Sequence, residues 1–152
     1  MIDLKEIFSY KPFALKDSQK DKFFFNNQKK LSIYHYKNCP EFKNISDNIF
    51  KKIDKCFSLE ELPFVHVKVF KELNLKSTIK KNLSKTLHSS GTSGKSKSKI
   101  NIDRNTSLLQ SKALSNIFST IIKKKMNFFF IEESLGKNLN SISASIAAIR
   151  GF

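Results

Sequence analysis

Half of the glycines in this 152-residue chain stand in one short run, and the whole chain contains only four. Glycine lets backbone N–H groups turn inward and approach a ligand closely, so such a run can form a concave anion-binding loop. Serine and threonine hydroxyls add hydrogen-bond donors, and one lysine adds positive charge. The run therefore predicts a phosphate-binding loop over residues 89–96, with the contacts made by Ser89, Ser90, Gly91, Thr92, Ser93, Gly94 and Lys95.

The residues on either side of the loop decide which kind of loop it is. Thr86 to His88 are extended in character, and Ser98 to Asp103 alternate polar and apolar residues, which predicts a strand before and a strand after the loop. A P-loop, G-x-x-x-x-G-K-[ST], would need glycine at position 89 and would open directly into a helix. Position 89 is serine and a strand is expected next, so the sequence favours a strand–loop–strand unit over a P-loop.

The first part of the chain is expected to be mainly helical. Helices are predicted over residues 2–8 and 18–38, the second ending at Cys39-Pro40 because a residue before proline is driven out of the helical region. A shorter helix is predicted over 41–56. Residues 64–70, in which three valines alternate with other residues, are predicted to form a strand.

The second part is expected to continue from the strand–loop–strand unit into a helix capped by Asn105 or Thr106. Apolar residues at four-residue intervals support that helix, and Lys123 to Lys125 suit its negative C-terminal end. A buried strand over 126–131 and a helix over 141–150 follow. The fold class is therefore α/β, within a single domain 1–152 that has a helical segment 1–60 and an α/β part 61–152.

The net charge of +15 admits nucleic acid, anionic lipid or nucleotide phosphates as partners. Between Ser77 and Lys125 there are eleven basic residues and one acid, Asp103, so a basic nucleic-acid-binding module is one alternative function. However, 26 of the 28 basic residues are lysine, whereas groove-reading sites favour arginine. Lysine-rich solvated faces and an AT-rich coding sequence are the simpler explanation of the charge.

Location follows from what the sequence lacks. The longest apolar run, Phe128 to Ile131, is far shorter than the ~18 residues of a membrane span. Asp3, Lys5 and Glu6 stand where a signal peptide would be apolar. Two cysteines do not make a disulfide scaffold. We therefore expect a cytoplasmic protein without a membrane span.

Residues 89–94 resemble the Ser-Ser-Gly-Thr-Thr-Gly loop of adenylate-forming enzymes, with Ser93 in place of the second threonine. The flanks are similar to those of the acyl-protein synthetases, the ATP-dependent fatty-acid-activating subunits of the bacterial luciferase aldehyde-supplying system. The similar segments are 34–39, 63–71, 98–103, 110–114 with Thr106, 128–132 and 141–152. A plain Ser/Gly-rich surface turn is the alternative for the loop taken alone.

The resemblance implies a function and a set of partners. Such enzymes join a carboxylic acid, here a fatty acid, to ATP with Mg²⁺, and pass the acyl group from the acyl-adenylate to a protein thiol and on to a reductase partner. On this pattern the residues 89–95 hold the β- and γ-phosphates. The chain covers well under half of such an enzyme, so it is expected to be the N-terminal portion of one, or a nonfunctional remnant.

Several chemistry-bearing residues lie outside the loop, and none is assigned a catalytic role. Cys39 and Cys56 precede the loop and do not match the acyl-accepting cysteine, so both are interpreted as core or surface thiols. His88 adjoins the loop and is either a nucleotide contact or an ordinary strand histidine. Glu132 and Glu133 are either Mg²⁺ ligands or a solvated strand end, and no metal site is predicted.

Overall fold

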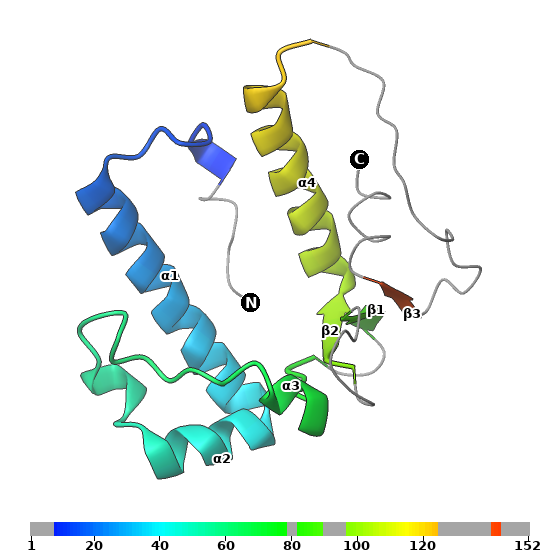
Figure 1. Cartoon of the computed structure of the whole chain (residues 1–152). Coiled ribbons are helices and arrows are strands. Elements are labelled where there is room, and N and C mark those ends of the chain that lie inside the picture. The colour runs from blue at the N-terminus through cyan, green and yellow to red at the C-terminus, as the bar shows by residue number, and fades with distance from the viewer. Residues whose placement is uncertain (1–7, 79–81, 90–96, 125–140, 144–152) are drawn as a thin grey trace. The chain divides into compact units, whose positions relative to one another are not determined.

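A computed structural model describes residues 8–78, 82–89, 97–124 and 141–143 (Figure 1). The chain divides into two compact units, Met1–Ser77 and Thr78–Phe152, and each is described here by itself. Residues 61–77, which the sequence analysis placed in the α/β part, belong to the first unit. The α/β fold class is confirmed, because helices come first and a sheet with a following helix comes second. That the whole chain acts as a single domain stays a prediction.

Two helices dominate the first unit, α1 (Asp17–Asn38) and α2 (Pro40–Ile49). They are separated by Cys39, whose extended backbone (φ −129°, ψ 101°) is the conformation that a following proline imposes. Pro40 then begins α2, where its missing N–H costs no helical hydrogen bond. The helix predicted over 18–38 is thus confirmed, whereas the one predicted over 41–56 ends at Ile49 and is followed by a short 3₁₀ turn, η2 (Ile53–Lys55).

The strand predicted over 64–70 is wrong. Residues 64–66 form no regular structure, and the single-turn helix α3 (Val69–Glu72) follows. The main-chain N–H of Val69 donates to the carbonyl of His66 at 2.9 Å, so the backbone is satisfied by local turns instead of a neighbouring strand. Alternating valines favour a strand only where a sheet face exists for them to pack on, and Val67 here is 65% exposed.

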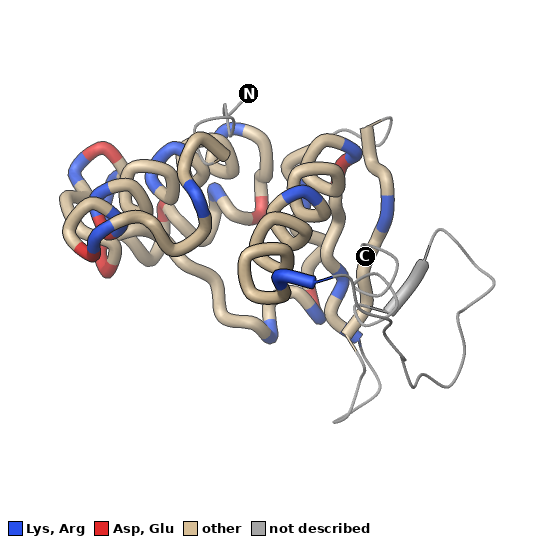
Figure 2. The backbone as a smooth tube through the Cα atoms, turned by 90° about the horizontal axis from the view of Figure 1, so that it is seen from above, with Lys and Arg blue, Asp and Glu red and all other residues tan. Residues whose placement is uncertain are grey.

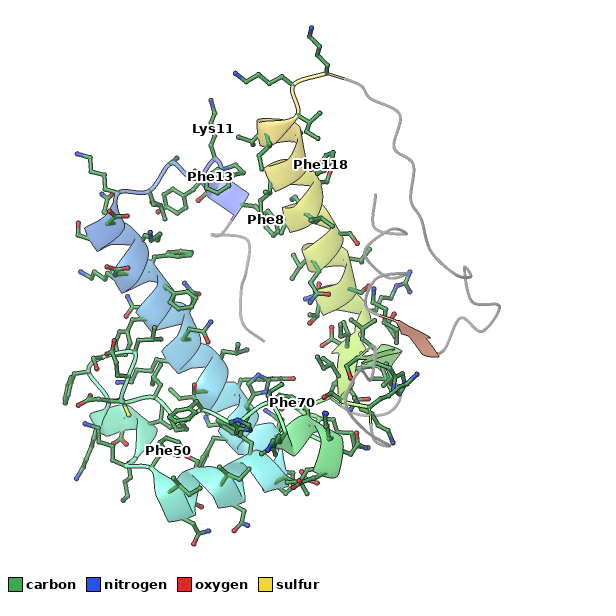
Figure 3. The ribbon with its side chains drawn as sticks, in the orientation of Figure 1. Phe8, Lys11, Phe13, Phe50, Phe70 and Phe118 are labelled. Carbon is green, nitrogen blue, oxygen red and sulfur yellow. The ribbon has the colours of Figure 1, made fainter. Side chains whose placement is uncertain are left out.

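Three side chains form the core of the first unit: Ile53, Cys56 and Leu62. Phe25 and Tyr36, both on α1, pack against this cluster. Outside it, Phe50, the residue after α2 that Figure 3 labels, meets Phe64 edge to face, with ring centroids 5.0 Å apart. The loop between α2 and α3 is therefore fixed onto α1 by apolar contacts, although it contains no long helix or strand.

The second unit is built on a three-stranded sheet with the order β2-β1-β3. Strands β1 (Leu83–His88) and β2 (Lys99–Asp103) pair antiparallel, as the sequence predicts for the two sides of the loop. Strand β3 (Ser141–Ser143) pairs parallel with β1. The helix predicted over 141–150 is therefore wrong at its first three residues. The rest of that helix, residues 2–7 of the helix predicted over 2–8, and the strand predicted over 126–131 lie outside the described residues.

Helix α4 (Arg104–Ile121) follows β2 without a loop. Its N-cap is Asp103, whose carboxylate Oδ1 accepts a hydrogen bond of 2.7 Å from the Thr106 N–H, so the prediction of Asn105 or Thr106 as the cap is wrong. Lys123 and Lys124 lie beyond the C-cap Ile122 and not in the last turn. The helix buries none of its residues fully, and Ile121 is 65% exposed.

We expect Asp103→Ala to lower the free energy of unfolding by about 1 kcal/mol, the usual cost of losing a helix N-cap. The Thr106 N–H would then lose its acceptor at the end of α4. The measurement is urea unfolding followed by circular dichroism at 222 nm. Asp103→Asn keeps an acceptor oxygen, so its free energy of unfolding should fall much less. Equal stability of the alanine variant and the parent would contradict the assigned cap.

Candidate functional site

The predicted phosphate loop begins and ends on paired strands. The main-chain N–H of Ser89 donates to the carbonyl of Ser98 at 3.3 Å, and the Ser98 N–H donates to Oγ of Ser89 at 3.1 Å. Ser98 is buried, so these bonds are protected from water and hold the two ends of the loop together. Of the predicted contact residues the structure places Ser89; residues 90–95 lie outside the described part of the chain.

The strand that leads into the loop is the central strand of the sheet. His88 at the end of β1 pairs with Lys99 on β2 and with Ser143 on β3. Figure 1 labels the three strands of this sheet. Because β1 and β3 are parallel, both carboxyl ends reach the same edge of the sheet. The predicted loop therefore starts at the edge of the sheet where β1 and β3 both end.

One face of the β1–β2 ladder is polar next to the loop. Thr86 and Asn101 are opposite each other in the register, and Oγ1 of Thr86 donates to Oδ1 of Asn101 at 3.1 Å. Side chains two residues apart share a face, so His88 and Lys99 lie on this same face, one step nearer the loop. Ile102, on the opposite face, is buried. The pairing of His88 with Lys99 was not predicted, although counting back from the two ends of the loop would have suggested it.

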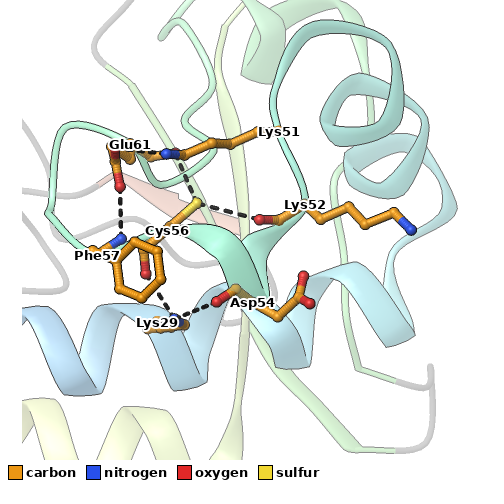
Figure 4. Close-up of polar contacts among 7 residues, drawn as sticks. All are labelled: Lys29, Lys51, Lys52, Asp54, Cys56, Phe57 and Glu61. Atoms are coloured by element: carbon orange, nitrogen blue, oxygen red, sulfur yellow. Dashed lines mark hydrogen bonds and ion pairs between the residues drawn. The ribbon is translucent and has the colours of Figure 1, made fainter.

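Both cysteines are structural thiols. Cys56 is fully buried, and its Sγ lies 3.0 Å from the carbonyl oxygen of Glu61 and 3.6 Å from that of Lys52 (Figure 4). Cys39 is 2% exposed and forms no disulfide, and its Sγ lies 3.5 Å from Oε2 of Glu41. A buried thiol that donates to main-chain carbonyls is a poor nucleophile, since reactive cysteines are accessible thiolates. Of the two interpretations, core or surface thiols, the structure shows the first, because both cysteines are buried.

Lys29 on α1 contacts the same cluster. Nζ of Lys29 donates to the carbonyl oxygens of Asp54 and Cys56, at 3.1 and 2.7 Å (Figure 4). It also lies over the rings of Phe25 and Phe57, with centroid distances of 5.8 and 5.6 Å. The ammonium group thus caps the carbonyls that η2 leaves unpaired. This lysine holds the fold, and its charge is not free for a ligand.

A second group of contacts fixes the loop after η2. Nζ of Lys51 and Oε1 of Glu61 form an ion pair at 2.6 Å, and Oε2 of Glu61 accepts from the Phe57 N–H at 2.6 Å (Figure 4). The hydrogen bond from Lys51, followed by that from Phe57, holds the pKa of the Glu61 carboxyl below its usual value. Both side chains are partly exposed, so the ion pair should add little to the free energy of unfolding. We assign it the role of positioning the loop after η2.

The end of the first unit is tied to α1 through Ser77. The Tyr34 hydroxyl donates to the Ser77 carbonyl at 3.1 Å, and Nδ1 of His35 lies 2.6 Å from the Ser77 hydroxyl oxygen in a shared hydrogen bond. The ring of Phe42 contacts His35 edge to face at 6.0 Å. Burial among these groups lowers the pKa of the His35 imidazole below its ordinary value.

His35 should make the first unit less stable in mild acid. An imidazole whose pKa is lower in the folded than in the unfolded chain leaves stability unchanged above about pH 6.5 and reduces it as the pH falls from there to the folded pKa. We expect the urea midpoint to fall between pH 7.5 and pH 5.5. His35→Gln should flatten this dependence, whereas His66→Gln, at an exposed histidine, should retain it. An unchanged slope in His35→Gln would contradict the assignment.

Acidic residues of the first unit outnumber those of the second, as Figure 2 shows in red, while basic residues occur in both.

Within the described ranges, His, Cys, Asp and Glu side chains form no group of three or more that could hold a metal ion. Likewise, no helix in the described part of the chain is long and apolar enough to cross a membrane.

The chain as a whole matches one protein family. The sequence model of the acyl-protein synthetase family, LuxE, matches residues 2–151. The chain belongs to the LuxE acyl-protein synthetase family. A search of curated protein sequences and a search of solved structures each returned no match. The family match covers both units of the chain, so the resemblance inferred from the loop and its flanks is confirmed for the whole sequence.

Membership of the LuxE family gives the loop its context. The predicted loop begins at the edge of the sheet where β1 and β3 end. The described residues near that edge contribute hydroxyl, amide, imidazole and ammonium groups from Ser89, Asn101, His88 and Lys99. These groups donate hydrogen bonds or carry positive charge, as an anion site requires.

Proposed function

We propose that this LuxE-family chain is the nucleotide-binding N-terminal portion of an enzyme that activates a carboxylic acid, of the fatty-acid class, with ATP. The carboxylate oxygen would attack the α-phosphorus of ATP, a new O–P bond would form, and the bond to the β-phosphate would break. The products are an acyl-adenylate and pyrophosphate. The acyl group would then pass to a protein thiol, with AMP as the leaving group, and on to a reductase partner.

In this proposal the residues 89–95 hold the leaving pyrophosphate. Backbone N–H groups at Gly91 and Gly94, the hydroxyls of Ser90, Thr92 and Ser93 and the Lys95 ammonium would stabilise the charge that develops on the β- and γ-phosphates. The observation that supports this most is the placement of Ser89 and Ser98, because their two hydrogen bonds close the loop at the carboxyl end of the central strand.

Mg²⁺ accompanies ATP in such chemistry and would neutralise phosphate charge. The described acidic residues offer no ligand set for it, and Glu132 and Glu133 lie outside the described residues. We therefore assign no residue of this chain to the ion and treat it as bound to the ATP phosphates. Cys39 and Cys56 are buried, so the thiol that receives the acyl group belongs to another part of the enzyme or to a partner.

The test is MgATP binding to the purified chain, measured by isothermal titration calorimetry. We expect a dissociation constant in the range of ~1 μM–1 mM that enzyme substrates commonly show. Pyrophosphate should compete with MgATP and adenosine should not, because the proposed contacts are to phosphates. The absence of MgATP binding would overturn the proposal, and tight DNA binding with a steep salt dependence would favour the nucleic-acid-binding alternative instead.

A further inference from the structure

We propose that the turn before α1 docks on a membrane surface made of anionic lipids, with the Phe13 ring entering the apolar layer and Lys11 and Lys16 contacting the headgroups. All three residues belong to the first unit and to the part of it that the structure describes. None of them belongs to the predicted loop, so membrane docking and the proposed function stand or fall separately.

Phe13 occupies a backbone position that favours glycine. The Ala14 N–H donates to the Lys11 carbonyl at 3.1 Å, which closes a four-residue β-turn with Pro12 and Phe13 at its centre. The ring of Pro12 fixes its φ at about −65°, and Phe13 has a φ of 64°. This combination is a type II turn, in which the third residue is usually glycine or asparagine. A phenylalanine there is strained, because its Cβ crowds the neighbouring carbonyl oxygen.

The strained residue contributes little packing to the fold. Phe13 is 78% exposed, although an aromatic side chain gains most when it is buried. The nearby Tyr10 contacts Phe23 of α1 edge to face, with ring centroids 5.9 Å apart, and so attaches this segment to the helix. Figure 3 labels Lys11 and Phe13 in the segment that precedes α1. A stiff, attached turn thus presents an apolar ring to solvent, and backbone strain of this kind is typical of sites that bind a ligand or partner.

The charges around this ring favour an anionic surface. Residues 9–22 contain four lysines and two aspartates, which gives a net charge of +2. Asp17 forms an ion pair with Lys20 at 3.0 Å. By contrast, Lys11 and Lys16 are exposed and form no ion pair with the carboxylates that the structure describes. Lysine side chains beside an exposed aromatic ring can reach lipid phosphates while the ring enters the apolar layer.

Phe57 is as exposed as Phe13 but has different surroundings. It is 83% exposed, and the Lys29 ammonium lies 5.6 Å from its ring centroid. Residues 50–61, which contain it, have three lysines and three acidic residues and therefore no net charge. An anionic surface gains nothing from such a segment. Exposure together with unpaired lysines is what distinguishes the turn at Phe13, and Phe57 serves as the control in the experiments.

The first experiment places a fluorescent reporter at the proposed contact, which is possible because the chain contains no tryptophan. Phe13→Trp and Phe57→Trp are each titrated with vesicles of equal parts phosphatidylglycerol and phosphatidylcholine, and with vesicles of phosphatidylcholine alone. We expect the emission of Phe13→Trp to shift to shorter wavelength with the anionic vesicles and to be quenched by lipids brominated on their acyl chains. Phe57→Trp should show neither change, and the neutral vesicles should bind much more weakly.

Co-sedimentation with the same vesicles tests the ring without a reporter. Phe13→Gly should weaken binding to the anionic vesicles about tenfold or more, because the apolar contact is lost. Its melting temperature should not fall, since glycine relieves the strain in the turn. Phe57→Gly makes the same substitution at the control position and should bind as the parent does. Unchanged binding of Phe13→Gly would overturn the proposal.

The lysines are tested in pairs. The double variant Lys11→Gln, Lys16→Gln should weaken binding about tenfold, whereas Lys52→Gln, Lys55→Gln, with the same loss of charge, should change it little. Equal losses in the two double variants would show attraction by net charge alone and would overturn the proposal. Emission of Phe13→Trp that responds to polyglutamate and not to the vesicles would also overturn it, in favour of an acidic protein partner.

Discussion

Replacing one glycine of the loop, Gly94→Val, should weaken MgATP binding by about 10- to 100-fold. A side chain at this position would keep the backbone N–H groups from approaching the phosphates, and a lost hydrogen bond to a charged group costs about 1.5–3 kcal/mol. A tenfold change in affinity corresponds to about 1.4 kcal/mol. The measurement is the dissociation constant for MgATP by calorimetry, with circular dichroism to show that the variant is folded.

Gly136→Val provides the matched control, because it makes the same substitution at a glycine outside the loop. It should bind MgATP as the parent does. Equal affinity of Gly94→Val and the parent would remove the loop from the nucleotide site, and an equal loss in both variants would show a general effect on folding. In an intact enzyme, the same Gly94→Val change should reduce fatty-acid-dependent exchange between ATP and pyrophosphate.

The strands beside the loop could be predicted from sequence because their pattern and their partners are local. Leu83–His88 and Lys99–Asp103 are joined by one connection, and both contain the alternation that a half-buried ladder needs. The same holds for α1, which Cys39-Pro40 ends for a steric reason contained in two residues. Where the residues that determine a strand or a helix end lie within or next to it in the chain, the sequence alone was sufficient to predict it.

The wrong predictions concern segments whose structure depends on residues far away in the chain. Residues 64–70 alternate as a strand does, but no described strand pairs with them, and turn hydrogen bonds satisfy their backbone instead. Residues 141–143 have small side chains that suit a helix, yet they pair with β1, more than fifty positions earlier in the chain. Pairing over that distance depends on tertiary contacts, which local propensity does not contain.

At the candidate site, too, local features could be predicted from the sequence and the pairing between strands could not. The motif predicted the loop from its residue types, and β1–β2 pairing places its first residue, Ser89, at the end of the central strand. The motif did not predict that the ladder brings Lys99 opposite His88, because that depends on the register between strands. A one-residue slip would turn these side chains to the other face. Register between strands is therefore the property of this site that the sequence left open.

In the first unit, Leu62→Ala should lower the free energy of unfolding by about 2–5 kcal/mol, the range for removing a buried leucine side chain. Leu62 is 4% exposed and packs in the cluster with Ile53 and Cys56. The surroundings cannot close the resulting cavity easily, because the Cys56 thiol is bonded to the Glu61 carbonyl and Lys29 holds the Cys56 carbonyl. In thermal unfolding this corresponds to a fall of roughly 10 °C or more.

Leu59→Ala is the matched control, since the same side chain is removed three positions away at a residue that is 42% exposed. Leu59→Ala should change the free energy of unfolding by no more than about 0.5 kcal/mol. Both variants would be unfolded in urea and followed by circular dichroism at 222 nm, where α1 and α2 dominate the signal of this unit. A similar small loss in both would mean that Ile53, Cys56 and Leu62 do not form the core of the first unit. A large loss confined to Leu62→Ala would show that this small cluster holds the α2–α3 loop against α1.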